Sequence, residues 1–311
     1  MFYRAALAAL LVSTAFADNQ VLQFQTASTQ QSFQEIATVI RSITEVPEAM
    51  VNTEQKSLTI GGTPDQMAAA AWIFQQLEHK ATGKLQYKMP GPGDDVIGVF
   101  YIPKVTSARQ LQEAGTVARS TGHWRKLFLY SGNNAAVVRG TAADIAMAEW
   151  IFSELNQPAN PIYHAPNSGD DFTRVFYISK ARTPIQVQEL ATVARSIGEI
   201  ERMFVYSPTN AMVVRGKASE IALAEWLFAA LDGPTKRPGA DHKMPATNEA
   251  VRIMYLTPEE SIQRLQEVAT SIRKTAQIRR LFTYSELRAI VTRGTPEQLA
   301  NAERLIAERT R

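Results

Sequence analysis

The sequence predicts an α+β protein of four tandem βαββα modules, each a three-stranded sheet with two helices on one face. A period of 76 to 78 residues runs along the chain, as between Arg139, Arg215 and Arg293. Within each period, short apolar runs bounded by turn residues are typical of strands, and segments with apolar residues every three or four positions are typical of helices. A module of about 62 residues is near the lower size for independent folding, so its sheet needs helices over one face.

Each module begins with a short strand and an amphipathic helix. The first strands are predicted at residues 22–24, 100–102, 176–178 and 254–256, and the first of these is the weakest copy. Apolar residues at helical spacing follow, such as Phe33, Ile36 and Ile40 in the first module. The same pattern recurs in the third module at 187, 190 and 194.

A hairpin and a second helix complete the module. Aromatic second strands, for example Phe128 and Tyr130, lead through polar turns at 132–134 and 208–210 into third strands that end in glycine. The second helices are predicted at 67–77, 145–155, 221–231 and 299–309. Thr63, Thr141 and Thr295 stand at their N-cap positions, where a hydroxyl accepts a hydrogen bond from a free helix N–H.

The predicted domain organisation follows this repeat. A signal peptide is expected at residues 1–17, modules at 18–80, 95–157, 171–233 and 249–311, and linkers at 81–94, 158–170 and 234–248. The linkers resemble one another around Tyr87, Tyr163 and His242. We therefore expect them to lie against their neighbours and not to be free coil.

The beginning of the sequence predicts export. A short basic start precedes an apolar run to Phe16, and Ala15 and Ala17 form the small-x-small pattern of a cleavage site. The run is shorter than a membrane span, and no later stretch is long and apolar enough to be one. We expect a mature protein that is periplasmic or secreted. It has no cysteine, and its net charge of +3 does not indicate nucleic-acid binding.

Tryptophans on the second helix are the first candidate contacts. Trp72, Trp150 and Trp226 project nearly opposite the predicted core face, and Arg304 takes this position in the last module. Internal repeats need an apolar outer face, and a terminal repeat needs a polar one. We therefore expect each tryptophan to contact the following linker or module. The alternative is that the second helix is buried on both sides within its own module.

Arginines at the end of the third strand are the second candidates. Arg139, Arg215 and Arg293 recur in three modules, and the first module has no counterpart. One interpretation is a repeated contact with a partner. The other, which we favour, is a charge on an edge strand that prevents pairing between sheets.

No pattern indicates catalysis. The four histidines lack the helical i, i+4 spacing of a metal site, and we expect no metal or cofactor. The pairs Asp94–Asp95 and Asp170–Asp171 precede first strands and are interpreted as turn caps, since the fourth module has Asn248–Glu249 instead. The sequence predicts a non-enzymatic protein, although an enzyme that uses an unrecognised arrangement stays open.

The sequence resembles the periplasmic N-domains of bacterial secretins in three features: the order of elements, the Val-Val-Arg-Gly hairpin end and the step from Leu231 to Asp232. It also resembles the related short N-terminal domain of secretins and outer-membrane receptors. This resemblance implies docking, assembly or ring building with protein partners in the cell envelope, or self-association. No segment here resembles the outer-membrane β-domain of a secretin, so we expect a role other than the pore. The order also resembles RNA-binding KH domains, but their Gly-x-x-Gly loop is missing. A stand-alone exported protein that binds a peptide, glycan or other ligand is the alternative function.

Overall fold

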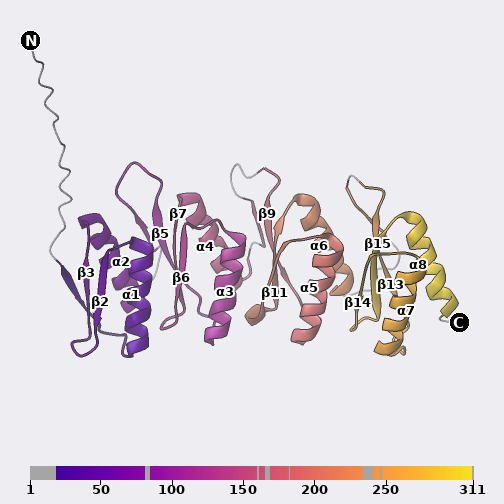
Figure 1. Ribbon diagram of the computed structural model, residues 1–311, viewed down its shortest axis with the longest axis horizontal. Helices are drawn as coiled ribbons and strands as arrows, with labels where there is room; N and C mark the ends of the chain where they lie inside the picture. The colour runs from indigo at the N-terminus through magenta and orange to yellow at the C-terminus, as the bar shows by residue number, and fades with distance from the viewer. Residues whose placement is uncertain are drawn as a thin grey trace, which may run out of the picture. The chain divides into compact units, whose positions relative to one another are not determined.

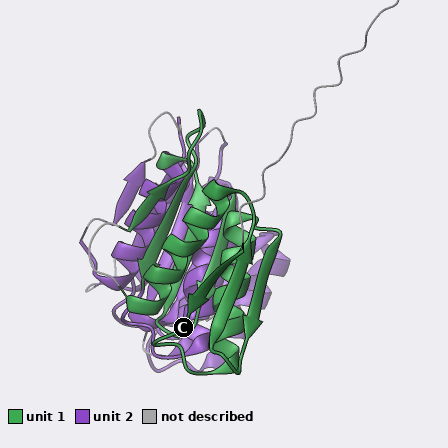
Figure 2. Cartoon of the chain, turned by 90° about the vertical axis from the view of Figure 1, so that its left-hand side faces the viewer, with its two compact units in different colours: residues 1–101, 125–142 green, residues 102–124, 143–311 purple. Residues whose placement is uncertain are grey.

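The computed structural model describes residues 19–80, 85–159, 161–164, 169–181, 183–233, 241–245 and 247–309. The predicted signal peptide at residues 1–17 lies outside these residues. By its internal contacts the chain divides into two compact units (Figure 2). Unit 1 comprises residues 1–101 and 125–142, and unit 2 comprises residues 102–124 and 143–311. No helix in the described ranges is both long and apolar enough to cross a membrane.

Unit 1 begins with a three-stranded antiparallel sheet. Strand β3 (Ser57–Gly61) lies between β1 (Gln20–Gln23) and β2 (Glu48–Asn52). Helices α1 (Gln30–Thr44) and α2 (Pro64–His79) pack on one face of it (Figure 1). Both helices begin at a threonine whose side chain accepts the N3 amide in a capping box.

The same two helices also contact a second sheet of unit 1. This sheet has the order β4-β5-β7-β6, with β4 (Gln86–Lys88), β5 (Val96–Tyr101), β6 (Lys126–Tyr130) and β7 (Ala135–Gly140). Its buried residues Ile97, Val99 and Val137 belong to the same hydrophobic core as Phe33 and Phe74 of the helices. Helices α1 and α2 therefore lie between two sheets and bury apolar residues against both.

Unit 2 repeats this arrangement. One sheet has the order β10-β11-β9-β8 and the other β12-β13-β15-β14, all antiparallel. The strands are β8 (Ile162–His164), β9 (Phe172–Tyr177), β10 (Arg202–Tyr206), β11 (Ala211–Gly216), β12 (His242–Lys243), β13 (Ala250–Tyr255), β14 (Arg280–Tyr284) and β15 (Ala289–Gly294). The helices are α3 (Ala108–Thr121), α4 (Ala142–Asn156), α5 (Pro184–Gly198), α6 (Ala218–Leu231), α7 (Ile262–Thr275) and α8 (Pro296–Arg309).

Two hydrophobic cores surround the last two helix pairs of unit 2. Helices α5 and α6 share a core with their own sheet and with the next one, because Val251, Ile253 and Val291 are buried in the same cluster as Leu190 and Leu227. Helices α7 and α8 pack on the other face of the β12–β15 sheet, where Leu265 and Ile290 are buried. The last sheet is thus covered on both faces by helices.

The predicted α+β class and the βαββα order are confirmed. The count of three strands holds for the first sheet, whereas the other three sheets have a fourth strand. The extra strands β4, β8 and β12 come from the predicted linkers and pair with the following first strand. Free backbone groups at the sheet edge are satisfied in this way, which explains why the linkers resemble one another. The exact module boundaries stay predictions.

A buried carboxylate at the end of the second helix fixes the loop before the first helix. Asp232 is 7% exposed and accepts hydrogen bonds from the backbone of Ser179, Lys180 and Ala181 at 2.7 to 3.2 Å. Glu78 accepts the corresponding amides in unit 1. Each acid thus satisfies three N–H groups that the strands and helices leave unpaired.

We predict that Asp232→Ala lowers the free energy of unfolding of unit 2 by about 2 to 4 kcal/mol, because three partly buried amides lose a charged acceptor. Urea denaturation measures the loss, and hydrogen exchange should accelerate at Ser179–Ala181 first. Glu225→Ala is the control. It removes an exposed ion pair with Arg174 and should change stability by less than about 1 kcal/mol. Equal effects of both variants would contradict the anchoring role.

Candidate interaction surfaces at the module junctions

We define a junction as the place where a helix pair packs on the sheet that follows it. Junction 1 joins α1 and α2 to the β4–β7 sheet in unit 1. Junction 2 joins α3 and α4 to the β8–β11 sheet, and junction 3 joins α5 and α6 to the β12–β15 sheet, both in unit 2. The three junctions share a set of polar contacts.

A buried arginine is the first of these contacts. Arg139 lies at the end of β7 and is 6% exposed. Its guanidinium donates to the Asp95 carboxylate at 2.6 to 3.1 Å and to the carbonyl of Ile43 at 2.7 Å. Ile43 is in the last turn of α1, where carbonyl groups have no helical partner and the helix dipole is negative. One side chain therefore neutralises both an acid and a helix end.

The same contact occurs at the other junctions. Arg215 donates to Asp171 and to the carbonyl of Thr121 at the end of α3. Arg293 donates to Glu249 at 2.7 Å and to the carbonyl of Ile197 in the last turn of α5 at 3.2 Å. The hydrogen bonds and charge of the arginine hold the pKa of Asp95 and Asp171 below the usual range of a carboxyl group.

These positions overturn the edge-strand interpretation of the arginines. Strands β7, β11 and β15 each lie between two other strands, so their residues are in the middle of a sheet. The guanidinium groups bind residues of the same chain, and an additional partner contact stays a prediction. The interpretation of the acids was also wrong, because Glu249 binds the arginine of the fourth module as Asp95 and Asp171 bind those of the second and third. A constant spacing of 44 residues between acid and arginine was the available signal.

A glutamate on the first helix makes the second repeated contact. Glu35 accepts hydrogen bonds from the backbone N–H and hydroxyl of Ser131, which follows β6. Glu113 binds Ser207 in the same way, and Glu189 binds Ser285. Burial raises the pKa of Glu35, but the hydrogen bonds from Ser131 and Gln31 outweigh this effect and lower it.

A tyrosine on the first strand makes the third. The hydroxyls of Tyr101, Tyr177 and Tyr255 donate to carbonyls near the end of the preceding second helix, those of Gln76, Glu154 and Ala230. Burial raises the pKa of the Tyr177 and Tyr255 hydroxyls above the usual value for tyrosine. These hydroxyls therefore stay protonated donors. The sequence patterns did not identify the glutamate or the tyrosine contact.

The predicted tryptophans contact the linker strands. The rings of Trp72 and Tyr87 are 5.5 Å apart, those of Trp150 and Tyr163 are 5.1 Å apart, and those of Trp226 and His242 are 5.5 Å apart. All three tryptophans are half-buried, and Arg304 is exposed. The tryptophans thus contact the linker strand. That they hold modules together stays a prediction.

At each end of the repeat, some of the junction residues are replaced. On the β1–β3 sheet, Gly61 stands where the arginine would be and Gln23 where the tyrosine would be, and Met50 is 57% exposed. On the last helix pair, Ser271 replaces a buried valine of α1, α3 and α5. Arg304 replaces the tryptophan. The β1–β3 sheet therefore cannot form the arginine and tyrosine contacts, and the last helix pair lacks the valine and the tryptophan of the three junctions.

The remaining candidates have structural partners. Asp94 accepts the N–H of Ala142, and Asp170 accepts that of Ala218, so each caps the start of a second helix. His164 stacks on Phe172, and His123 lies 3.2 Å from Arg215. In the part of the chain that the structure describes, no group of three or more histidine, aspartate or glutamate residues could hold a metal ion.

Fold and contacts together define an α+β protein of the tandem-repeat class, in which the helices of one βαββα segment pack on the sheet of the next at each junction. No family model matches the chain. No curated protein matches it either. Solved structures do, and they include secretins and the N-terminal domain of a secretin.

The N-terminal domain of the secretin XcpQ from Pseudomonas aeruginosa is 14% identical, with a TM-score of 0.24; the match covers 69% of this chain and 99% of that one. Aeromonas hydrophila ExeD is 15% identical, with a TM-score of 0.18, and 70% of this chain matches 41% of that chain. The secretin complex AspS–GspD of ETEC is 12% identical, with a TM-score of 0.18, and 93% of this chain matches 54% of that chain. The chain thus spans under half the length of ExeD and about half that of the chain it matches in the AspS–GspD complex.

We predict that acid weakens junction 1 through Asp95. Its folded-state pKa is lowered, so its stabilising contribution is complete above the unfolded-state pKa of about 3.9 and is lost as the pH falls through the folded-state value. At about pH 7, Asp95→Asn should lower the free energy of unfolding of unit 1 by about 2 to 3 kcal/mol, because Arg139 stays buried without its acid.

Urea denaturation at about pH 7 and at about pH 2.5 tests this, since the stability gap between the wild-type protein and Asp95→Asn should narrow as acid protonates the Asp95 carboxylate. Asp65→Asn, an exposed change in the first turn of α2, is the control and should have little effect on the difference in unfolding free energy between the two pH values. A constant gap between wild type and variant at both pH values would refute the assignment.

Junction 2 differs from the others at one position, which suggests a stabilising change. Glu45 and Glu199 each bind the junction arginine and a basic residue of the second strand, but His123 takes their place at junction 2. We predict that His123→Glu, facing Arg215 and Arg202, stabilises unit 2 by up to about 1 kcal/mol at low salt. Thermal unfolding at two salt concentrations measures it. His123→Gln should give no salt-dependent gain, and a gain of equal size there would exclude the charge mechanism.

Proposed function

We propose that this chain is a non-enzymatic, exported interaction protein of the cell envelope, which docks to or scaffolds a protein complex. The observation that carries the proposal is the repetition of the junction contacts. The same arginine, glutamate and tyrosine positions are used to join successive segments, so the repeat builds a periodic protein surface. A periodic surface is typical of repeat proteins that bind other proteins.

Two further features support this role. The expected signal peptide at residues 1–17 would deliver the chain to the periplasm or beyond. Gly61 stands at the arginine position of the first sheet, so stacking of one copy on the next would lose the arginine contact. Partners are then expected to bind along the sides of the repeat. The structures similar to this chain include a complex of a secretin with its pilotin, AspS–GspD.

The alternative, a stand-alone exported protein that binds a peptide or other ligand, is favoured by one observation. A groove of about 780 Å³ lies between α3 and α5 in unit 2. The two functions differ in whether the chain is part of a stable envelope complex.

Site-specific photocrosslinking in the native host distinguishes them. A photoreactive amino acid in place of Gln188, exposed on α5, should give a discrete envelope-protein adduct. The same photoreactive amino acid in place of Gln66, at the start of α2, is the control. We expect the Gln188 adduct to disappear when residues 1–17 are deleted, because the protein is then not exported. Absence of any protein adduct from four or five exposed side positions would refute the docking role.

A further inference from the structure

Exposed residues of the first helix are the starting point. The four first helices share a glutamine and, four residues later, a threonine, and all of these side chains are exposed. They are Gln34 and Thr38, Gln112 and Thr116, Gln188 and Thr192, and Gln266 and Thr270. Each threonine hydroxyl only donates to the carbonyl of that glutamine, at 2.7 to 2.9 Å. Threonine is a weaker helix former than alanine by about 0.7 kcal/mol or less. Neither helix stability nor core packing accounts for its repetition.

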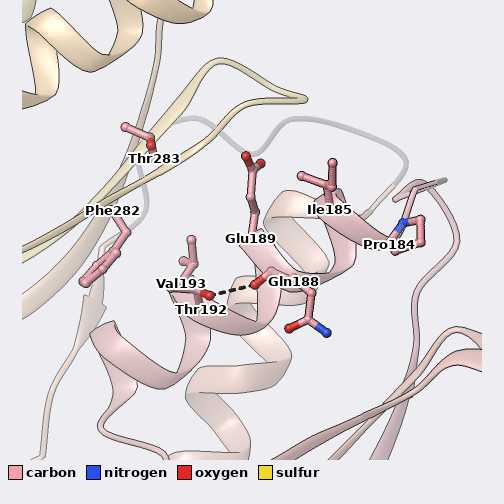
Figure 3. A pocket seen from close by; sticks show the side chains of 8 residues that line it. All are labelled: Pro184, Ile185, Gln188, Glu189, Thr192, Val193, Phe282 and Thr283. Atoms are coloured by element: carbon pink, nitrogen blue, oxygen red, sulfur yellow. Dashed lines mark hydrogen bonds between the residues drawn. The ribbon is translucent and has the colours of Figure 1, made fainter. Parts of the chain in front are cut away.

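A groove lies beside these residues at junction 2. Its volume is about 780 Å³; Gln112 and Thr116 of α3 line one side, Gln188 of α5 lines the other, and Phe204 and Val205 of β10 form part of its lining. The corresponding surface recurs at junction 3, where Gln188, Glu189 and Thr192 of α5 lie beside Phe282 and Thr283 of β14 (Figure 3). In α3 and α5, the repeated glutamine and threonine therefore line a groove beside the second strand of the following sheet.

Strand β10 brings backbone hydrogen-bonding groups to this groove. It is an edge strand, paired only with β11 among the described residues. The carbonyl of Met203 points to the free edge, because it accepts a hydrogen bond from Arg195 of α5 at 2.8 Å. Since backbone groups alternate along a strand, the N–H and carbonyl of Val205 also point to this edge. An added strand could pair with them.

The charges around the groove indicate which kind of strand it would bind. Arg109 and Arg195 are the basic side chains of its lining, and Glu113 is the acidic one. The Glu113 carboxylate is already bound by Ser207 and by Arg109. The surface is thus slightly basic, with amide and hydroxyl groups from the helices, and complements an extended segment that carries an acidic residue.

We propose that the groove between α3 and α5 binds an extended, acidic segment of a partner protein, which adds as a strand to the free edge of β10. Backbone pairing with Val205 supplies affinity, and side chains on alternate positions contact Phe204 on one face and the Gln112–Thr116 row at the rim. The inference rests on the proposed function, since it specifies where and how a partner binds.

The test uses the full mature chain and a fluorescein-labelled heptapeptide of alternating valine and threonine with a glutamate at each end. Fluorescence anisotropy should show saturable binding below about 1 mM, and hydrogen exchange of the amides of Met203 and Val205 should slow. The same peptide, N-methylated at alternate backbone nitrogens so that it cannot pair, should bind at least about tenfold more weakly.

Two variants locate the site. Val205→Pro removes the outward N–H at an edge position where proline is tolerated, and Thr116→Trp fills the groove from an exposed helix position. Each should weaken binding about tenfold, whereas Thr116→Ser should bind as the wild type does. Circular dichroism and urea midpoints check that all variants fold.

Three outcomes overturn the proposal: no binding at about 1 mM, equal binding of the N-methylated peptide, or undiminished binding to both Val205→Pro and Thr116→Trp. The proposed function is judged separately by the envelope adducts. Adducts that persist in Val205→Pro, together with failed peptide binding, would retain envelope docking and reject the groove. Adducts absent everywhere, with peptide binding intact, would retain the groove and reject docking to an envelope complex.

Discussion

The buried arginine at the end of each internal third strand connects three parts of the structure at once. Arg139 is anchored by Asp95 in its own sheet and reaches the last turn of α1. A buried guanidinium without an acid would be strongly destabilising, so the acid and the arginine occur together in the modules that have them. Because the carbonyl at the helix end belongs to the preceding segment, the same side chain also fixes the spacing between a helix pair and the next sheet.

The other contacts follow the geometry that this arginine maintains. The tyrosine on the first strand reaches the second helix, and the glutamate on the first helix reaches the hairpin after the second strand. These polar contacts surround the apolar residues shared by helices and sheets, such as Val39 and Val99. Hydrophobic burial is non-directional, whereas hydrogen bonds require definite distances and angles. The apolar residues supply most of the stability of a junction, and the polar contacts determine its register.

The repeated contacts also decide which surfaces are left for binding. The sheet faces at the junctions are occupied by helices, and the linker strands occupy one edge of three sheets. The second strand remains at the opposite edge, partly protected by an arginine of the first helix that binds its carbonyl, as Arg195 does with Met203. Such protection limits uncontrolled pairing at an edge. The grooves along these edges are the surfaces that the fold presents periodically.

Local sequence patterns were sufficient for the elements but not for their neighbours. The 76 to 78 residue period, the apolar spacing of residues such as Ile36 and Ile40, and the N-cap threonines determined the βαββα order, because these signals depend on residues close in the chain. The tryptophans could be placed on the outer side of the second helix for the same reason. Their contact with Tyr87 and its counterparts required the linker strands, whose two or three residues are too short to be recognised as strands.

The sequence by itself therefore determined the number of segments, their order and the replacement of the outer tryptophan by Arg304 in the last one. Only the tertiary structure decided that Arg139, Arg215 and Arg293 lie in the middle of a sheet and bind the preceding segment. Strand order depends on which edges meet in space, and the helix-end carbonyls that these arginines bind are 94 to 96 residues away along the chain. Pairing over such separations is set by the packing of whole helices and sheets, which no local pattern records.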